Sequence, residues 1–155
     1  MAKVVAVCRS KRRGVRKEPI SRGLFVENYG LVGDAHASSE TQRQVSLLAR
    51  ESTDKKRNLV SGASPGDNAE NLTTEGIDWP SLPLGTKVSI GQEVILEITE
   101  IGKKEHPSGY AILPEGGISI LPGEGVFAKV IRGGEVKPGD KIEIRSGNPL
   151  PWIDK

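Results

Sequence analysis

The most constraining feature of this sequence is the frequency with which turn-forming residues interrupt it. Glycine fills 19 and proline 10 of its 155 positions, and they follow no repeat. The apolar runs between them are therefore short, and many contain the β-branched residues valine and isoleucine. This pattern is typical of short strands joined by tight turns rather than of long helices. With 35% hydrophobic residues, a chain of this length can bury one core.

Alternating apolar and polar residues predict the individual strands. In the clearest case, residues 94–101, we expect Val94, Leu96 and Ile98 to face the core. Pro138 followed by Gly139 predicts a type II turn just before the last strand. Residues 44–48 fit either a strand or the start of a helix. Further strands are expected at residues 3–8, 24–26, 88–90, 118–120, 126–131 and 141–145.

Only one segment has the composition of a helix. Residues 49–59 are rich in helix-forming side chains, and Ser61-Gly62 would end that helix. A doubly wound α/β fold needs several crossover helices, so this pattern disfavours it. We expect a mainly β fold, a closed or nearly closed β-barrel with one substantial helix and short helical turns. This domain would span residues 1–146, and residues 147–155 would form an extended, proline-rich tail.

Charge is distributed unevenly along the chain. The net charge is +2, but residues 9–17 hold six cations and no anion, which leaves 16 cations against 20 anions elsewhere. No aromatic residue lies among these cations, so base stacking is unsupported and nucleic acid is an unlikely partner. The basic loop could instead hold a phosphate through Arg12, Arg13 and Lys17. The alternative is an ordinary solvated face.

Cysteine content and hydropathy suggest the compartment. Cys8 is the single cysteine, which excludes an internal disulfide and fits a reducing cytoplasm. Its apolar surroundings indicate a small core residue. No apolar run approaches the roughly 20 residues that span a bilayer. We therefore expect a cytoplasmic protein without a membrane segment.

A series of polar segments between the strands is unusual in its order and spacing. The series resembles the MOSC domain, the C-terminal module of molybdenum cofactor sulfurases, and above all its small stand-alone bacterial members. The resemblance covers residues 3–144. The segments that carry it are Gly-Asp-Ala-His at 33–36, Arg-Gln-Val-Ser-Leu-Leu at 43–48, residues 65–78, Leu-Pro-Leu-Gly-Thr at 82–86, Ile-Thr-Glu-Ile-Gly-Lys at 98–103, and residues 125–130 and 134–140.

This resemblance implies a β-barrel with a pocket for the molybdopterin form of the molybdenum cofactor. It also implies either sulfur transfer to that cofactor or reduction of N-hydroxylated compounds, with a redox or cofactor-biosynthesis protein as a possible partner. No pyridoxal phosphate is expected, because the segments match the MOSC module and not the lyase domain of full-length sulfurases. The alternative function is a non-catalytic carrier or sensor that binds a pterin or another small anion.

One position departs from the family pattern. The resemblance places a reactive cysteine in the loop after residues 98–103, but Glu105 stands there, followed by His106; a second family cysteine corresponds to Tyr110. A carboxylate cannot carry a sulfane sulfur, yet it can ligate an oxidised metal as a hard oxygen donor. Glu105 is thus the candidate metal ligand, with His106 and Asp34 as further catalytic candidates. The alternative for Glu105 is a solvated carboxylate without a metal.

Several other polar residues are candidates for cofactor binding. Asp34 and His36 could orient a cofactor, or Asp34 could merely stabilise a turn. A two-histidine, two-carboxylate metal site combining these residues with Glu105 and His106 has no short-range spacing to support it. Polar side chains beside apolar ones on the predicted strands could line a pocket, or could face outward. The full cofactor-binding set is Arg12, Arg13, Lys17, Gly33, His36, Arg43, Gln44, Ser46, Asn71, Thr73 and Lys103.

Overall fold

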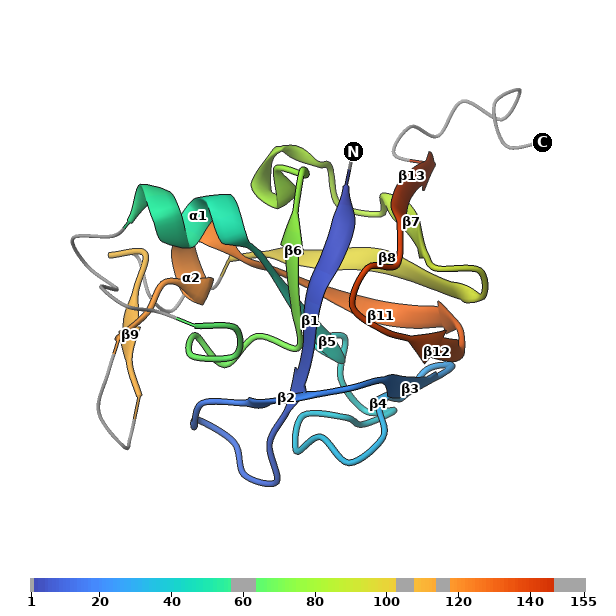
Figure 1. Cartoon of the computed structure of the whole chain (residues 1–155), viewed down its shortest axis with the longest axis horizontal. Coiled ribbons are helices and arrows are strands. Elements are labelled where there is room, and N and C mark those ends of the chain that lie inside the picture. Colours follow the sequence, from blue (N-terminus) through green and yellow to red (C-terminus); the bar gives the residue numbers. More distant parts are fainter. Residues whose placement is uncertain (1, 57–63, 103–107, 114–117, 147–155) are drawn as a thin grey trace.

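The protein is mainly β, as the turn frequency predicts (Figure 1). The computed structural model describes residues 2–56, 64–102, 108–113 and 118–146. Eight strands form the principal sheet in the order β13-β7-β8-β11-β5-β6-β1-β2, and all neighbours are antiparallel except β5 and β6. These strands are β1 (Lys3–Arg9), β2 (Glu18–Ile20), β5 (Val45–Ala49), β6 (Leu72–Glu75), β7 (Lys87–Ile90), β8 (Val94–Ile101), β11 (Val126–Arg132) and β13 (Ile142–Ser146).

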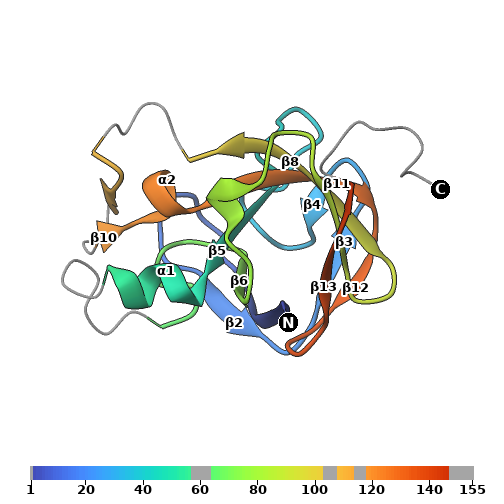
Figure 2. The ribbon, with the colours of Figure 1, turned by 90° about the horizontal axis from the view of Figure 1, so that it is seen from above.

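Two smaller sheets and three short helical segments complete the described chain. Both views place the two α-helices and the smallest sheet at one end of the molecule, opposite the three-stranded sheet (Figure 1, Figure 2). The three-stranded sheet contains β12 (Gly134–Val136), β3 (Gly23–Val26) and β4 (Gly30–Leu31), and the smallest pairs β9 (Ala111–Ile112) with β10 (Ile118–Ser119). The helical segments are α1 (Arg50–Lys55), the 3₁₀ turn η1 (Trp79–Ser81) and α2 (Leu121–Glu124).

The principal sheet does not close into a barrel through continuous strand pairing. Of the two forms that the sequence predicts, a closed or a nearly closed barrel, the closed one is therefore wrong. β2 occupies the free edge of β1 from Val7 to Arg9, so only the N-terminal half of β1 remains available to β13. There, Val4 N–H donates to Asp140 O at 2.9 Å and Ile142 N–H donates to Ala2 O at 3.0 Å. The two edges of the sheet therefore meet in a single isolated bridge rather than in a ladder.

The core follows the predicted alternation. Val94, Leu96 and Ile98 of β8 are buried, so the expected inward face is confirmed. A second, smaller apolar cluster lies apart from this core, between β5, β10, α2 and β11. It contains Leu48, Ile120, Leu121 and Phe127.

The expected substantial helix is short. Helix α1 covers Arg50–Lys55, and residues 57–59 of the predicted span lie outside the described part. Ser52 is the one buried residue of α1, so the helix has no apolar face whose burial would stabilise further turns. The ambiguous residues 44–48 belong to a strand, β5. At the predicted type II turn, Gly139 has a φ of 94°, the left-handed value that this turn requires.

Among the described residues, no helix has the length and apolar character needed to cross a bilayer. The predicted tail at 147–155 lies outside the described residues.

Candidate functional site

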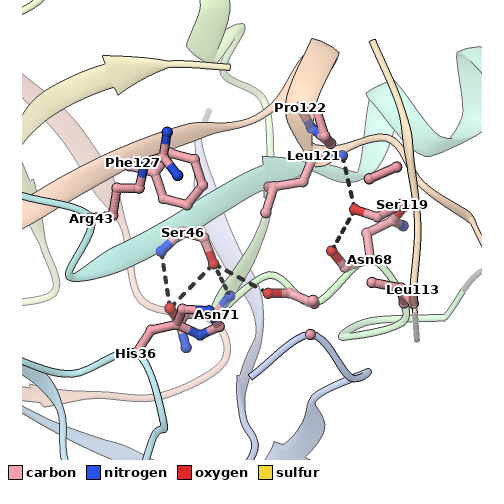
Figure 3. A pocket seen from close by; sticks show the side chains of 13 residues that line it. His36, Arg43, Ser46, Asn68, Asn71, Leu113, Ser119, Leu121, Pro122 and Phe127 are labelled. Atoms are coloured by element: carbon pink, nitrogen blue, oxygen red, sulfur yellow. Dashed lines mark hydrogen bonds between the residues drawn. The ribbon is translucent and has the colours of Figure 1, made fainter. Parts of the chain in front are cut away.

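A pocket opens at the helical end of the molecule, between the second apolar cluster and the polar loops (Figure 3). Its empty space measures about 490 Å³ including the open mouth. Strands β5, β9 and β11, helix α2 and the loop before β6 all contribute to it. The residues that line it are Gly14, His36, Arg43, Ser46, Asn68, Ala69, Asn71, Ala111, Leu113, Ser119, Leu121, Pro122 and Phe127.

Ser46 and Asn71 form the polar floor of this pocket. Ser46 N–H donates to Asn71 Oδ1 at 2.9 Å, and Asn71 N–H donates to Ser46 Oγ at 2.9 Å. Asn71 Nδ2 donates onward to Cys8 O at 3.1 Å. β5 and β6 are parallel neighbours, and these side chains link the start of the pair. Both predicted site residues thus line the pocket, and they are fixed in place by each other.

Asn68 forms the wall opposite His36. Its Oδ1 accepts the Ile120 N–H at 2.8 Å, and its backbone oxygen accepts the Ser119 hydroxyl at 2.8 Å. Asn68 Nδ2 has no hydrogen-bond partner among the described residues. Every fully buried side-chain nitrogen of those residues has a partner, so Asn68 Nδ2 is not fully buried. Since the Asn68 residue is only 1% exposed and borders the pocket, this nitrogen is reached from the pocket. The site therefore contains an amide donor available to a ligand.

A buried carboxyl group holds the loop that carries Asn68. Glu70 Oε1 accepts the Asn68 N–H and Oε2 accepts the Gly66 N–H, both at 3.1 Å, while the Thr73 hydroxyl donates at 2.6 Å. Complete burial raises the pKa of Glu70 despite these hydrogen bonds. Ala69, which lies between Asn68 and Glu70, has a φ of 66°, a conformation that costs an L-residue roughly 1–2 kcal/mol. The pocket wall is thus built from a constrained loop.

Lys17, Asp34 and His36 form a second network at the pocket. Lys17 Nζ lies 2.7 Å from Asp34 Oδ1, and the two side chains are 1% and 0% exposed. Asp34 Oδ1 accepts the Ser10 N–H and Oδ2 accepts the His36 N–H. Burial alone would raise the pKa of Asp34, but the Lys17 ammonium and these N–H groups together lower it. His36 lines the pocket, whereas Asp34 is not among the lining residues. The bond from the His36 N–H, two residues on, is the turn-stabilising contact that was one of the two alternatives for Asp34, and its role toward a cofactor stays a prediction.

Arg43 lies at the rim beside Phe127. Its Nε and Nη2 each lie 2.7 Å from an oxygen of Glu100, a bidentate pair. Its guanidinium carbon lies 5.2 Å from the centre of the Phe127 ring, within cation–π range. Because Glu100 compensates its charge, Arg43 offers the pocket a flat, stacked surface more than a free positive charge.

Other predicted site residues lie away from the pocket wall. Gln44 is fully buried, and its amide bridges Asn28, Ser38, Thr41 and the Val130 N–H. Thr73 contacts Glu70 behind the floor. Gly33 has a φ of 88°, and a Cβ there would lie 2.8 Å from the Arg9 side chain. These three residues therefore have structural partners, and their role as cofactor ligands stays a prediction.

The basic loop reaches the pocket through Gly14. Arg12 and Arg13, immediately before it, are exposed. Lys17, three residues after it, is buried in its ion pair. The loop thus brings two solvent-facing cations close in sequence to the pocket lining.

The predicted metal site falls largely outside the described residues. Lys103, Glu105 and His106 lie in the undescribed segment 103–107. Within the described ranges, no three histidine, cysteine, aspartate or glutamate side chains gather in a way that could hold a metal ion. Cys8 is buried in β1, and burial together with the nearby Glu70 raises the pKa of its thiol to about 12. Its expected role as a core residue is confirmed.

Sequence reasoning missed the wall formed by Asn68 and Ser119 and the apolar side formed by Leu121 and Phe127. Asn68 lies in one of the segments that carry the MOSC resemblance, and that was the available signal. The apolar residues carry no signal, because an apolar residue that lines a pocket alternates along a strand as a core residue does.

Comparison with known proteins finds similarity in structure but not in sequence. No protein-family model matches the chain, and no curated protein matches it. YuaD from Bacillus subtilis superposes with a TM-score of 0.68 at 17% identity, covering 92% of this chain and 94% of that one. YiiM from Escherichia coli gives 0.64 at 16%, covering 94% and 70%, and YiiM from Geobacillus stearothermophilus gives 0.66 at 15%, covering 99% and 81%. The chain has the fold of these proteins.

This likeness supports the MOSC-type fold that the order of the polar segments predicts. At such low identity it shows the fold and not the activity, because one fold hosts many functions.

Proposed function

We propose that the chain binds the pterin of a molybdenum cofactor in this pocket. The observation that carries the proposal is the contrast between the pocket's two sides. His36, Ser46 and Asn71 lie on one side of the pocket, and Leu121, Pro122 and the Phe127 ring lie on the other (Figure 3). A flat heterocycle with polar edges matches that contrast, since its face packs on apolar groups and its edges form hydrogen bonds.

The basic loop supports a phosphate-bearing ligand. Gly14 lines the pocket, and the exposed cations Arg12 and Arg13 precede it. Exposed arginines bind phosphate through bidentate hydrogen bonds as well as charge. Molybdopterin carries both a pterin and a phosphate, so the residues present fit the organic part of this cofactor. When bound, the cofactor would supply a molybdenum centre able to exchange sulfur or to reduce N-hydroxylated compounds.

The direct test is the composition of freshly purified protein from a host that makes the cofactor. We expect a pterin, detected by fluorescence after oxidation, and molybdenum to co-purify with the wild-type chain. Ala111→Trp should abolish this, because residue 111 lines the pocket. The matched control is Ile112→Trp on the next residue, which is 73% exposed. A wild-type protein without pterin, or two variants that behave alike, would refute the proposal.

A non-catalytic carrier or sensor is the second candidate, and the state of Cys8 favours it. Persulfide chemistry needs an accessible thiolate. Cys8 is the single thiol of the chain, and it is buried with a pKa raised to about 12. The chain would then hold its ligand without transferring sulfur.

Glu105→Cys separates these two functions. Because Cys8 is buried, a cysteine at position 105 would be the one readily alkylated thiol of the native chain. If the pocket otherwise serves a molybdenum centre, this variant should retain more molybdenum and gain reduction of N-hydroxylated compounds. If it gains neither metal nor activity while still binding pterin, the carrier or sensor function is the better account.

A further inference from the structure

The side-chain amide of Asn68 is held in one orientation. Its Oδ1 lies 2.8 Å from the backbone nitrogen of Ile120. A backbone N–H donates and cannot accept, so the amide atom that faces it must be the oxygen. The opposite orientation would set two donors against each other and leave the N–H of Ile120, a residue only 1% exposed, without an acceptor. The amino group, Nδ2, is therefore directed away from Ile120.

Both backbone groups of Asn68 are held as well. Its N–H donates to Glu70 Oε1 at 3.1 Å, and its carbonyl oxygen accepts the Ser119 hydroxyl at 2.8 Å. Together with the bond from Ile120, these contacts fix Asn68 at three atoms. A group held in this way loses little conformational entropy when a ligand binds, so more of the interaction energy contributes to affinity.

The Nδ2 donor of Asn68 is unpartnered and open to the pocket. Asn68 is 1% exposed and lines the pocket, and its Nδ2 has no hydrogen-bond partner among the described residues. The side chains of Leu113 and Leu121, which line the same pocket, offer it no acceptor. An unpaired donor in such a place is unfavourable, and an acceptor on a ligand removes that penalty.

We propose that Asn68 is a specificity-determining residue whose Nδ2–H selects a ligand that presents a carbonyl oxygen to this wall of the pocket. On a pterin this atom is the 4-carbonyl oxygen, which projects beyond the ring and has two lone pairs. An amino group in its place would set one donor against another. The orientation of the amide stands on the contacts of Asn68 alone, whereas the identity of the ligand rests on the proposed function.

The orientation is tested by NMR on the ligand-free protein. We expect a scalar coupling across the hydrogen bond between the Ile120 amide ¹⁵N and the Asn68 side-chain ¹³Cγ, because this coupling requires that Oδ1 accepts the Ile120 N–H. The bond from Gly91 N–H to Lys141 O, also 2.8 Å long, is the internal reference in the same spectrum. A reference coupling without the Asn68 coupling would overturn the orientation, whether or not any pterin binds.

Selectivity is tested with neopterin and its 4-amino counterpart, which carries an amino group where neopterin has the carbonyl oxygen. Wild type should bind neopterin about tenfold more tightly than the amino compound. Equal affinities, or a preference for the amino compound, would overturn the selective role. If wild type binds neither compound, the proposed function and the ligand part of this inference both fail, and the coupling still decides the orientation.

Asn68→Asp tests whether this preference comes from Asn68. The variant keeps an oxygen for the Ile120 N–H and replaces the Nδ2 donor by a second oxygen that accepts. At pH 8, which favours the carboxylate over the carboxylic acid, it should bind neopterin about tenfold more weakly and prefer the amino compound. An unchanged preference would overturn the role of Asn68.

Asn28→Asp is the matched control for the added charge. Asn28 Oδ1 also accepts a hydrogen bond, from Gln44 Nε2 at 3.1 Å, and Asn28 is not among the lining residues. Its affinities should stay within about twofold of wild type. Should Asn68→Asp fail to fold, the Nδ2 protons of wild-type Asn68 decide its role: they should shift downfield when neopterin binds, and unshifted protons would overturn it.

Discussion

Asn71 holds Ser46 in place by two reciprocal hydrogen bonds, from Ser46 N–H to Asn71 Oδ1 and from Asn71 N–H to Ser46 Oγ, each at 2.9 Å. The pair links two parallel strands, β5 and β6, at the floor of the pocket. Asn71 Nδ2 extends the link to the backbone of β1. The polar floor is therefore also a structural joint between three strands.

Asn71→Ala should destabilise the fold by about 2–5 kcal/mol. The substitution leaves the Ser46 N–H and the Cys8 carbonyl buried without partners, and each such group costs about 1–3 kcal/mol. Urea unfolding measures the loss. Gln92→Ala is the control, because it removes an exposed amide from a turn and should change stability by less than about 0.5 kcal/mol. Similar losses of stability in both variants would argue against a role of Asn71 in holding the three strands together.

Glu70→Gln should change how stability depends on pH. Burial raises the pKa of Glu70 above its ordinary value of 4.5, so the folded protein holds a proton that the unfolded chain releases. Its contribution to stability is therefore complete below pH 4.5 and declines as pH rises toward the folded pKa, by at most about 1.4 kcal/mol per pH unit. The variant lacks this titration, so the stability of wild type relative to Glu70→Gln should fall as pH rises above 4.5. A constant difference would contradict the raised pKa.

Asp34→Asn should show the opposite dependence of stability on pH. The pKa of Asp34 lies below its ordinary value of 3.8, so its contribution is complete above pH 3.8 and is lost as pH falls through the folded pKa. Relative to Asp34→Asn, wild type should thus lose stability on acidification. The same urea series, run at several pH values, measures both variants.

Ala69→Gly should leave the fold as stable or stabilise it by up to about 1 kcal/mol. Ala69 has a left-handed φ of 66°, which glycine adopts without strain, and this relief outweighs the extra freedom of glycine in the unfolded chain. Ala49→Gly is the matched control: its φ is −79°, so glycine there should destabilise by at least about 0.5–1 kcal/mol. Thermal unfolding of both variants checks the difference, and a marked loss in Ala69→Gly would show that no strain is stored there.

Arg12→Ala and Arg13→Ala should weaken binding of neopterin monophosphate by about two- to fivefold each at low salt, because each removes an exposed cation beside the pocket loop. High salt should shrink the effect by screening these charges. Neopterin without its phosphate should bind both variants as it binds wild type. Arg145→Ala, on β13, is the control for a distant cation. Unchanged affinity for the phosphorylated ligand at low salt would exclude the basic loop as a phosphate site.

Strands β1, β7, β8, β11 and β13 were predictable because turn residues and alternation are local signals, whereas β2 and β6 of the same sheet were not expected. Residues 94–101 form β8, with its inward face as expected. The length of α1 was not predictable, because a helix-forming composition cannot replace a missing apolar face. Sheet closure was not predictable either, since it depends on how much of the edge of β1 is paired with β2.

The candidate site was predictable in part, for a related reason. A sequence shows which side chains are polar, but not which of them satisfy one another. Gln44 and Thr73 are polar neighbours of the pocket segments, yet their hydrogen bonds are made inside the fold. Asn68 keeps a donor for the pocket only because Glu70 fixes its backbone and Ile120 takes its side-chain oxygen.

The most direct test of the pocket as a pterin site is a residue-resolved NMR titration of the ligand-free chain with neopterin. We expect saturable shifts at the Asn68 side-chain amide, at the backbone amides of Ser46 and Asn71, and at Ser119, all of which border the pocket. Shifts confined to the groove beside α1, around Ser52 and Gly76, would place the ligand elsewhere. No shifts at millimolar neopterin would contradict the account as a whole.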